Sequence, residues 1–219
     1  MIYAYVICDP AVAAASRRSR GLGGAMLRSL EAEGLAAVYS RHRSLRPRPS
    51  PEFVLAHERV IEAIMRHGDV LPMRFGAQLE SEEGLATAVT ERREELLRAL
   101  ERVRGRVELG LRVIPRHAPD RPQHEHSGRA YLLARVAEQR RADEATRELH
   151  APLASLAAAS VVRERPVPPA VLVAAYLVDK DRVVEFRSRA DELAARHEQL
   201  QVVVTGPWPP YSFSTEPGR

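Results

Sequence analysis

The sequence predicts an α+β protein of two domains, and three observations carry that prediction. Segments rich in β-forming residues alternate with amphipathic helical segments along all 219 residues. Strict apolar alternation begins afresh at Val107, just after Gly105, which indicates a domain boundary. The run Val202–Val204 resembles a strand buried on both faces, and the Gly and Pro residues that follow must end it. We therefore expect domains at 1–104 and 105–205, and a Pro/aromatic tail at 206–219 that packs on the protein's own body.

Composition favours a globular cytoplasmic protein. Apolar residues make up 45% of the chain, which is enough for real cores. The net charge is only +4 although the pI is near 9.6, and the charges alternate along helices instead of forming basic blocks. The single Cys8 excludes an internal disulfide and is expected to pack in a core. The longest apolar run, 170–178, is too short to span a bilayer, and the N-terminus lacks a signal-peptide pattern.

The first part of the chain predicts strands joined by turns. Ile2–Cys8 is rich in β-formers and ends at Asp9-Pro10, so it should be a strand. The small, Gly-bearing segment 11–24 predicts a loop, since its glycines lack the spacing of a phosphate-binding turn. Segments 26–31 and 35–40 flank Glu33-Gly34, which predicts a hairpin. The Pro-rich segment 44–51 predicts an extended linker.

Two helices and one strand complete the first domain. Ser50-Pro51-Glu52 is typical of a helix start, and one face of this helix should be buried. The face comprises Phe53, His57, Val60, Ile61 and Ile64. Segment 70–75 predicts a strand that Pro72 confines to an edge or bulge. A second helix should run from Ser81 to near Gly105, with Leu85, Val89, Leu96, Leu100 and Val103 inward. This order predicts a smaller antiparallel α+β domain, similar to a ferredoxin-like unit without its first helix.

The second domain has the element order β-α-β-β-α-β, which is the order of ferredoxin-like domains. The predicted elements are a strand at 107–113, a loop at 115–127, a helix from Gly128 with a kink or break at Pro152, strands at 161–167 and 171–178, a helix from Asp181, and a strand at 200–205. We expect the last strand to lie inside the sheet.

The sequence offers few candidates for catalysis or cofactor binding. His57-Glu58 begins like a zincin motif, but position 61 is Ile instead of His, so a polar contact of His57 on the helix face is the simpler interpretation. His117, His124 and His126 lie in a Pro-rich loop without metal-ligand spacing. We therefore predict no catalytic residue, no cofactor and no metal. An RNA-binding module or a small cytosolic enzyme with a ferredoxin-like cleft remains as an alternative, although the RNA-binding pattern would have only Tyr176 for base stacking.

Five residues are candidates for partner or interdomain contacts. Arg74 lies in L-P-M-R-F-G, where alternation places Phe75 inward and Arg74 outward, as an exposed charge or as part of an ion pair. Trp208, Tyr211 and Phe213 lie in the tail, in a chain with only 5% aromatic residues. Large rings on a Pro-stiffened backbone lose little entropy on docking. We expect the tail to pack on the body and to help fix the two domains, while a docking surface for a partner is the competing hypothesis.

Four phrases together resemble one known family. They are H-E-R-V-I-E-A-I-M at 57–65, V-L-P-M-R-F-G at 70–76, G-R-A-Y-L-L at 128–133, and V-T-G-P-W-P-P-Y-S-F at 204–213. In this order and spacing they resemble the gas vesicle protein GvpF/GvpL family over essentially the whole chain. The resemblance implies a two-domain α+β protein without enzymatic activity, an accessory or minor structural protein of gas vesicle assembly. It also implies contacts with the shell protein and other accessory proteins in the cytoplasm, at the gas vesicle, and none with nucleic acid or membrane.

Overall fold

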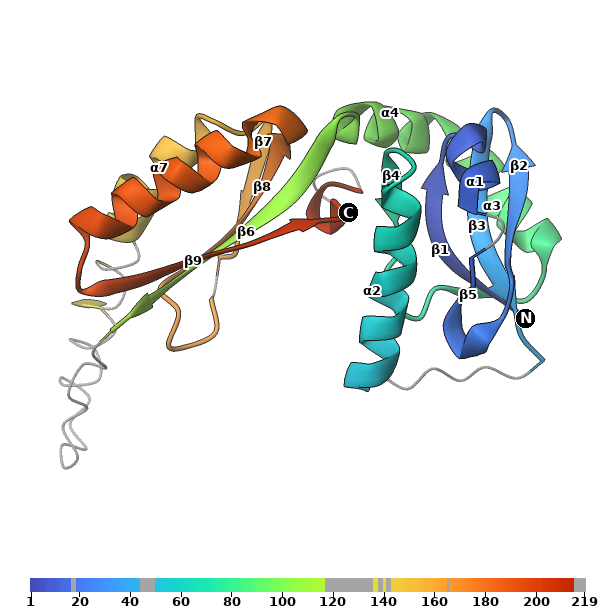
Figure 1. Ribbon diagram of the computed structural model, residues 1–219, viewed down its shortest axis with the longest axis horizontal. Helices are drawn as coiled ribbons and strands as arrows, with labels where there is room; N and C mark the ends of the chain where they lie inside the picture. Colours follow the sequence, from blue (N-terminus) through green and yellow to red (C-terminus); the bar gives the residue numbers. More distant parts are fainter. Residues whose placement is uncertain are drawn as a thin grey trace. The chain divides into compact units, whose positions relative to one another are not determined.

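The computed structural model describes residues 1–16, 19–43, 50–116, 136, 137, 140, 143–164 and 166–214 (Figure 1). The chain divides into two compact units, named unit 1 and unit 2. Unit 1 comprises Met1–Arg106 and the segment from Trp208 onward, and unit 2 comprises Val107–Pro207. The predicted helix start at Gly128 and the loop histidines His117, His124 and His126 lie outside the described residues.

Unit 1 is an antiparallel sheet with helices. Its elements are β1 (Ile2–Cys8), α1 (Pro10–Ser16), η1 (Leu22–Gly24), β2 (Leu27–Ala32), β3 (Leu35–Arg41), α2 (Pro51–Met65), β4 (Val70–Pro72), β5 (Gln78–Leu79), α3 (Glu82–Glu91), α4 (Arg93–Val103) and η4 (Tyr211–Phe213). The strand order is β2-β3-β1-β4, and β5 also pairs with β1. All of β1 is buried, and one core joins its Tyr3 and Tyr5 to apolar residues of α1, α2 and β3.

Several predicted features of unit 1 are confirmed. The hairpin pairs Ala32 with Leu35, and its turn residues Glu33 and Gly34 both have positive φ, as the favoured two-residue hairpin turn requires. The N-terminus of α2 is capped by the Ser50 hydroxyl, which accepts from the Phe53 amide at 3.4 Å. The inward face of α2 is the predicted one, and β4 with Pro72 stands at the sheet edge.

Two predictions for unit 1 are wrong. The segment predicted as a loop contains helix α1, because the glycines begin only at Gly21 and the preceding Ala-rich stretch favours a helix with Pro10 in its first turn. The helix predicted from Ser81 to Gly105 is two helices, α3 and α4, with a break at Arg92. An unbroken helix would turn Arg92 or Arg93 toward the core, whereas the break leaves both side chains exposed.

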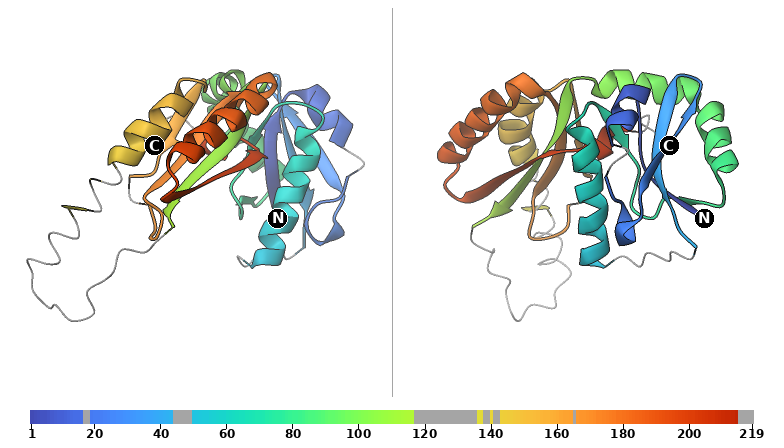
Figure 2. Two further views of the ribbon diagram at one scale, coloured as in Figure 1. Left: turned by 60° about the vertical axis from the view of Figure 1, so that its left-hand side comes forward. Right: turned by 45° about the vertical axis from the view of Figure 1, so that its right-hand side comes forward.

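Unit 2 is a second sheet with helices. Its elements are β6 (Arg106–Pro115), η2 (Thr146–His150, a π-helical turn), α6 (Ala151–Ala154), β7 (Ala159–Val162), β8 (Leu172–Asp179), η3 (Lys180–Arg182), α7 (Val183–Arg196) and β9 (Leu200–Trp208). The strand order is β7-β8-β6-β9, and the β7 and β8 strands are antiparallel. Figures 1 and 2 show α7 lying across one face of this sheet, where Phe186 and Leu193 enter the core. The predicted alternation of β6 is confirmed, since Val107, Leu109, Leu111 and Val113 are all buried.

The sequence predicts a kink or break at Pro152, and the structure shows a π-helical turn just before this residue instead of a break, because helical residues continue from η2 into α6. The five residues before α6 form the π-helical turn η2, and Pro152 lies at the start of α6. Proline has no N–H to offer the carbonyl of Glu148, and its ring crowds that carbonyl. The wider π-helical turn accommodates this defect.

The prediction of an interior position for the last strand is wrong. Strand β9 stands at the end of the order β7-β8-β6-β9, beside β6, and Val202–Val204 are only half-buried. Leu200, Val202 and Val204 pack against the core, so the valine run covers one face and the edge of the sheet. The strand predicted at 161–167 is also shorter, because β7 ends at Val162 and Val167 is exposed.

Candidate functional site: the tail anchor of unit 1

The C-terminal tail docks on unit 1. After β9, the residues Tyr211–Phe213 form the short helix η4. Phe213 is 3% exposed, and Tyr211 packs against the core that β1 and α2 share. Trp208 differs from both, because 42% of its surface is exposed. The tail therefore uses its last two aromatic residues for docking, and we name Glu58, Tyr211 and Phe213 the tail anchor.

A hydrogen bond ties the tail anchor to helix α2. The Tyr211 hydroxyl donates to Oε1 of Glu58 at 2.8 Å, across 153 residues of sequence. Burial raises the pKa of the Glu58 carboxyl, the Tyr211 hydrogen bond lowers it, and nearby Glu62 raises it. Burial also raises the pKa of the Tyr211 hydroxyl, so this group remains a donor at neutral pH. The contact is a hydroxyl donor held against a half-buried carboxylate.

His57, the residue before Glu58, lies in a buried aromatic cluster with Tyr3, Tyr5 and Phe75. His57 is fully buried, and its Nε2 donates to the carbonyl of Met73 at 3.0 Å. Its Nδ1 then accepts from the Tyr3 hydroxyl at 3.1 Å, and the Tyr3 oxygen accepts from the Gly76 amide at 3.0 Å. Burial lowers the pKa of His57, which keeps the neutral tautomer that both contacts require. This chain of hydrogen bonds joins β1, α2 and the turn after β4.

The aromatic rings pack around the same histidine. Tyr5 stacks on His57 with ring centroids 5.8 Å apart, and Phe75 meets it edge-on at 5.7 Å. Phe75 therefore lies inward, as its sequence position indicates. Arg74 is exposed, and its carbonyl accepts from the Ala77 amide in a turn at 3.2 Å, because β4 already ends at Pro72.

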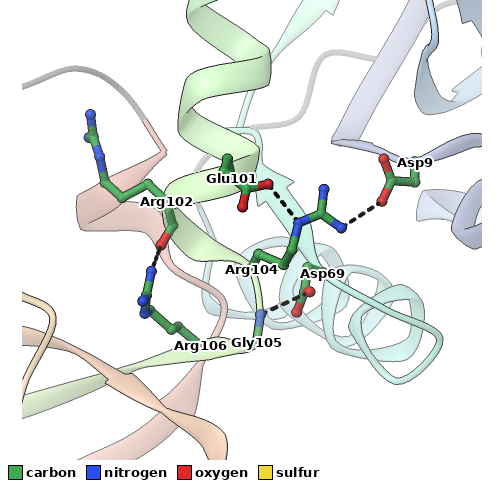
Figure 3. Close-up of polar contacts among 7 residues, drawn as sticks. All are labelled: Asp9, Asp69, Glu101, Arg102, Arg104, Gly105 and Arg106. Atoms are coloured by element: carbon green, nitrogen blue, oxygen red, sulfur yellow. Dashed lines mark hydrogen bonds and ion pairs between the residues drawn. The ribbon is translucent and has the colours of Figure 1, made fainter.

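A second polar group fixes the point where α4 leads into β6 (Figure 3). Gly105 has φ of 69°, a conformation that favours glycine, and its amide donates to Oδ2 of Asp69 at 3.0 Å. The Arg104 guanidinium lies between Glu101, at 2.8 Å, and Asp9, at 3.7 Å. These contacts lie within unit 1 and hold the last turn of α4 against the loops after β1 and α2.

Sequence reasoning found part of this site. Tyr211, Phe213 and Phe75 were candidates, and the structure places each of them against unit 1. Glu58 and Tyr3 were missed. Glu58 carried one signal, an acidic side chain next to an inward-facing histidine on an amphipathic helix, but its partner lies too far along the sequence for a spacing argument.

The anchor and the aromatic cluster are built for holding segments together. Their hydroxyls, imidazole and carboxylate bond to one another, to backbone groups or, for the Tyr5 hydroxyl, to Ser40 as well. The Cys8 thiol is buried, and burial raises its pKa to about 12, which suppresses the reactive thiolate. Within the described ranges, no three His, Cys, Asp or Glu side chains gather as a metal site, and no helix is long and apolar enough to cross a membrane.

Comparison with known proteins adds the family. A profile described as "Gas vesicle synthesis protein GvpL/GvpF" matches residues 1–215. The chain is 32% identical over 247 residues to gas vesicle protein L of Streptomyces sp. (strain CB03234), covering 97% of this chain and 92% of that protein. It is 27% identical over 197 residues to gas vesicle protein F1 of Halobacterium salinarum (strain ATCC 700922 / JCM 11081 / NRC-1), covering 88% and 84%.

Solved structures share the fold. The crystal structure of the gas vesicle protein GvpF from Anabaena sp. PCC7120 matches with a TM-score of 0.79 at 18% identity, over 99% of this chain and 97% of that one. GvpF from Microcystis aeruginosa matches with a TM-score of 0.77 at 17% identity, over 98% and 99%. The predicted α+β fold is thereby confirmed. With a family profile matched over 1–215, the chain belongs to the gas vesicle synthesis protein GvpL/GvpF family.

Proposed function

We propose that this protein is a non-enzymatic accessory or minor structural component of gas vesicle assembly. It acts through contacts with the shell protein and with other accessory proteins, in the cytoplasm at the gas vesicle. The observation that carries this proposal is the family match over 1–215, together with a relative named gas vesicle protein L at 32% identity.

The contacts of His57 and of the tail anchor support a role without catalysis. Both nitrogens of His57 are bonded, and Glu58 accepts from Tyr211, so these groups serve the fold. A general base would need access to a substrate proton, and His57 has no exposed surface.

The two units are proposed to be ferredoxin-like domains, with boundaries close to 104/105 and 205/206. Each contains the order β-α-β-β-α-β, if the helical residues before α6 are counted as the first helix of unit 2. In each, the first four strands follow the spatial order second, third, first, fourth. This shared order supports the assignment.

The RNA-binding alternative loses its one stacking candidate. Tyr176 on β8 is fully buried, and its hydroxyl lies 2.8 Å from Nδ1 of His150. A ring that stacks on a base must present its face to solvent. Tyr176 instead packs on Phe186, with ring centroids 5.0 Å apart.

Of the five residues that the sequence offers as candidates for contacts, we assign partner contacts to the two that are exposed, Trp208 and Arg74. Trp208 keeps 42% of its surface exposed, and Arg74 is exposed in the turn after β4. Trp and Arg are enriched among residues that dominate binding energy at interfaces. Phe75, Tyr211 and Phe213 are assigned to the support of unit 1.

A complementation experiment tests the proposal. The gene is removed from a gas vesicle operon, and the chain is returned with an affinity tag as wild type or Trp208→Ala. Wild type should restore buoyant vesicles and co-purify with at least one gas vesicle protein. The Trp208→Ala protein should accumulate normally but retain less partner, with Val184→Ala as the control, since Val184 is 79% exposed on α7. Vesicles that form normally without the gene, or a wild-type protein that retains no gas vesicle protein, would refute the proposed function.

A further inference from the structure

Unit 2 contains a cavity at the C-terminal end of α7 that no function above uses. Its volume is about 230 Å³. At roughly 30 Å³ per water, this is space for about seven or eight waters, which fits one long side chain better than a nucleotide or cofactor. The apolar part of its lining comes from Pro115, Ala145, Leu149, Val171 and Leu200. Because Leu149 and Val171 are buried, the cavity has an apolar floor.

Two acidic residues line this cavity. Glu144 and Glu148 lie four residues apart in the helical segment that ends in the π-helical turn η2, and both line the cavity. His197 also lines it, with Nε2 3.5 Å from Oε2 of Glu148. Gln199 is the remaining polar lining residue. None of the described residues that line the cavity is Lys or Arg, although Arg116 and Arg196 are sequence neighbours of lining residues.

The C-terminal end of helix α7 adds partial negative charge at the same cavity. His197 is the C-cap of the 14-residue helix α7, and its amide donates to the carbonyl of Ala194 at 3.1 Å. The C-terminal end of a helix carries partial negative charge and favours cations. Two acidic residues and the C-terminal end of a helix therefore border a cavity whose lining also includes buried apolar residues.

We propose that this cavity binds an arginine side chain of a partner protein. The aliphatic stem of arginine packs along apolar surface while its charged head reaches the rim. Its guanidinium is planar and weakly hydrated, so it suits two carboxylates beside an apolar lining better than an ammonium does. The inference uses the geometry of unit 2 alone and goes beyond the proposed gas vesicle role, because it applies to any partner that presents such a residue.

Peptide titration of the purified full-length chain tests this. The probe is acetyl-Gly-Arg-Gly-amide, followed by ¹H–¹⁵N NMR shifts of the backbone amides. The matched control peptide carries citrulline, which keeps the shape of arginine without its charge, and a lysine peptide and spermidine complete the series. Saturable shifts at Ala145, Leu149 and Leu200 are expected with the arginine peptide. The citrulline peptide should give none, and the lysine peptide and spermidine should bind more weakly.

Variants locate the site. Glu144→Gln with Glu148→Gln should weaken binding of the arginine peptide by roughly threefold to thirtyfold, as two part-exposed ion pairs imply. Glu144→Gln alone, which leaves the Glu148–His197 contact in place, should give part of that loss. Glu164→Gln, an exposed acid after β7 that does not line the cavity, should change nothing. Equal binding of citrulline, tighter binding of lysine or spermidine, or no saturable shift at the cavity would overturn the proposal. So would an equal loss with Glu164→Gln.

Discussion

The tail anchor makes a quantitative prediction, because its aromatic residues differ in burial. Phe213 is 3% exposed, and Phe213→Ala should leave a cavity that costs about 3–5 kcal/mol of unfolding free energy. Trp208 is 42% exposed, so Trp208→Ala forfeits only part of the roughly 1.5–3 kcal/mol that full burial of a large side chain contributes. We expect a cost of about 1–2 kcal/mol for Trp208→Ala on that basis. The smaller ring should therefore matter more to the fold than the larger one.

Tyr211→Phe isolates the hydrogen bond from the ring. The change keeps the aromatic packing but removes the hydroxyl that donates to Glu58. A hydrogen bond to a charged group contributes about 1.5–3 kcal/mol, and the half-buried position of Glu58 places the expected loss near the lower value.

Urea unfolding followed by far-ultraviolet circular dichroism measures all three variants against wild type. Trp208 is the only tryptophan, so its fluorescence separately reports the tail in Phe213→Ala and Tyr211→Phe. In those two variants the fluorescence transition should move to lower urea. If Trp208→Ala destabilises the protein as much as Phe213→Ala does, the assignment of docking to Tyr211 and Phe213 is wrong. If none of the variants changes stability, the tail does not dock on unit 1.

Three further predictions follow from unit 1. Burial lowers the pKa of His57 from 6.5, so the contribution of neutral His57 to the free energy of unfolding is fully present above about pH 6.5 and is lost as the pH falls through the folded-state pKa. In urea midpoints measured between pH 4 and 7, His57→Gln should therefore reduce the dependence of stability on pH. The pKa of Glu58 is raised from 4.5, so its stabilising contribution is present below about pH 4.5 and is lost as the pH rises through the folded-state pKa; Glu58→Gln should therefore gain stability relative to wild type on going from pH 4 to pH 7, and a constant difference would contradict this. Gly105→Ala should cost about 1–2 kcal/mol because its φ is 69°, whereas Gly84→Ala within α3 should be neutral or stabilising by about 0.5–1 kcal/mol, and equal thermal shifts would refute the role of the left-handed conformation.

Local chemistry explains which elements of the fold could be predicted. The hairpin at Glu33-Gly34 and the cap at Ser50 depend on residues within four positions of one another, so the sequence pattern contains the whole interaction. The break at Arg92 is different, because both helical halves are amphipathic and a single helix satisfies the pattern nearly as well. Only the cost of turning an arginine toward the core separates the two, and that cost depends on the tertiary fold.

The position of the last strand could not be predicted from hydrophobicity. A run of three valines is typical of a strand covered on both faces, yet β9 lies at an edge and buries its valines only in part. The element order gives the better guide, since a fourth strand that returns beside the first has no further neighbour in the sheet. Pairs far apart in the sequence, such as Tyr211 with Glu58, are likewise not visible in local hydrophobicity, because the two residues are 153 positions apart.

Residues from two of the phrases that resemble the family bond to adjacent residues of helix α2. Strand β4 ends at Pro72, and the carbonyl of the next residue, Met73, accepts from His57. Strand β9 ends just beyond Pro207, and the tail that follows donates from Tyr211 to Glu58. His57 and Glu58, adjacent on α2, thus bond to Met73 and to Tyr211, one through a buried imidazole and one through a half-buried carboxylate. The first contact needs the His57 ring and the second needs both the Tyr211 hydroxyl and the Glu58 carboxylate, whereas the helices between these phrases need only an apolar face. The sequence constraint should therefore concentrate in H-E-R, L-P-M-R-F-G and P-P-Y-S-F, where it serves the support of unit 1 rather than a reaction.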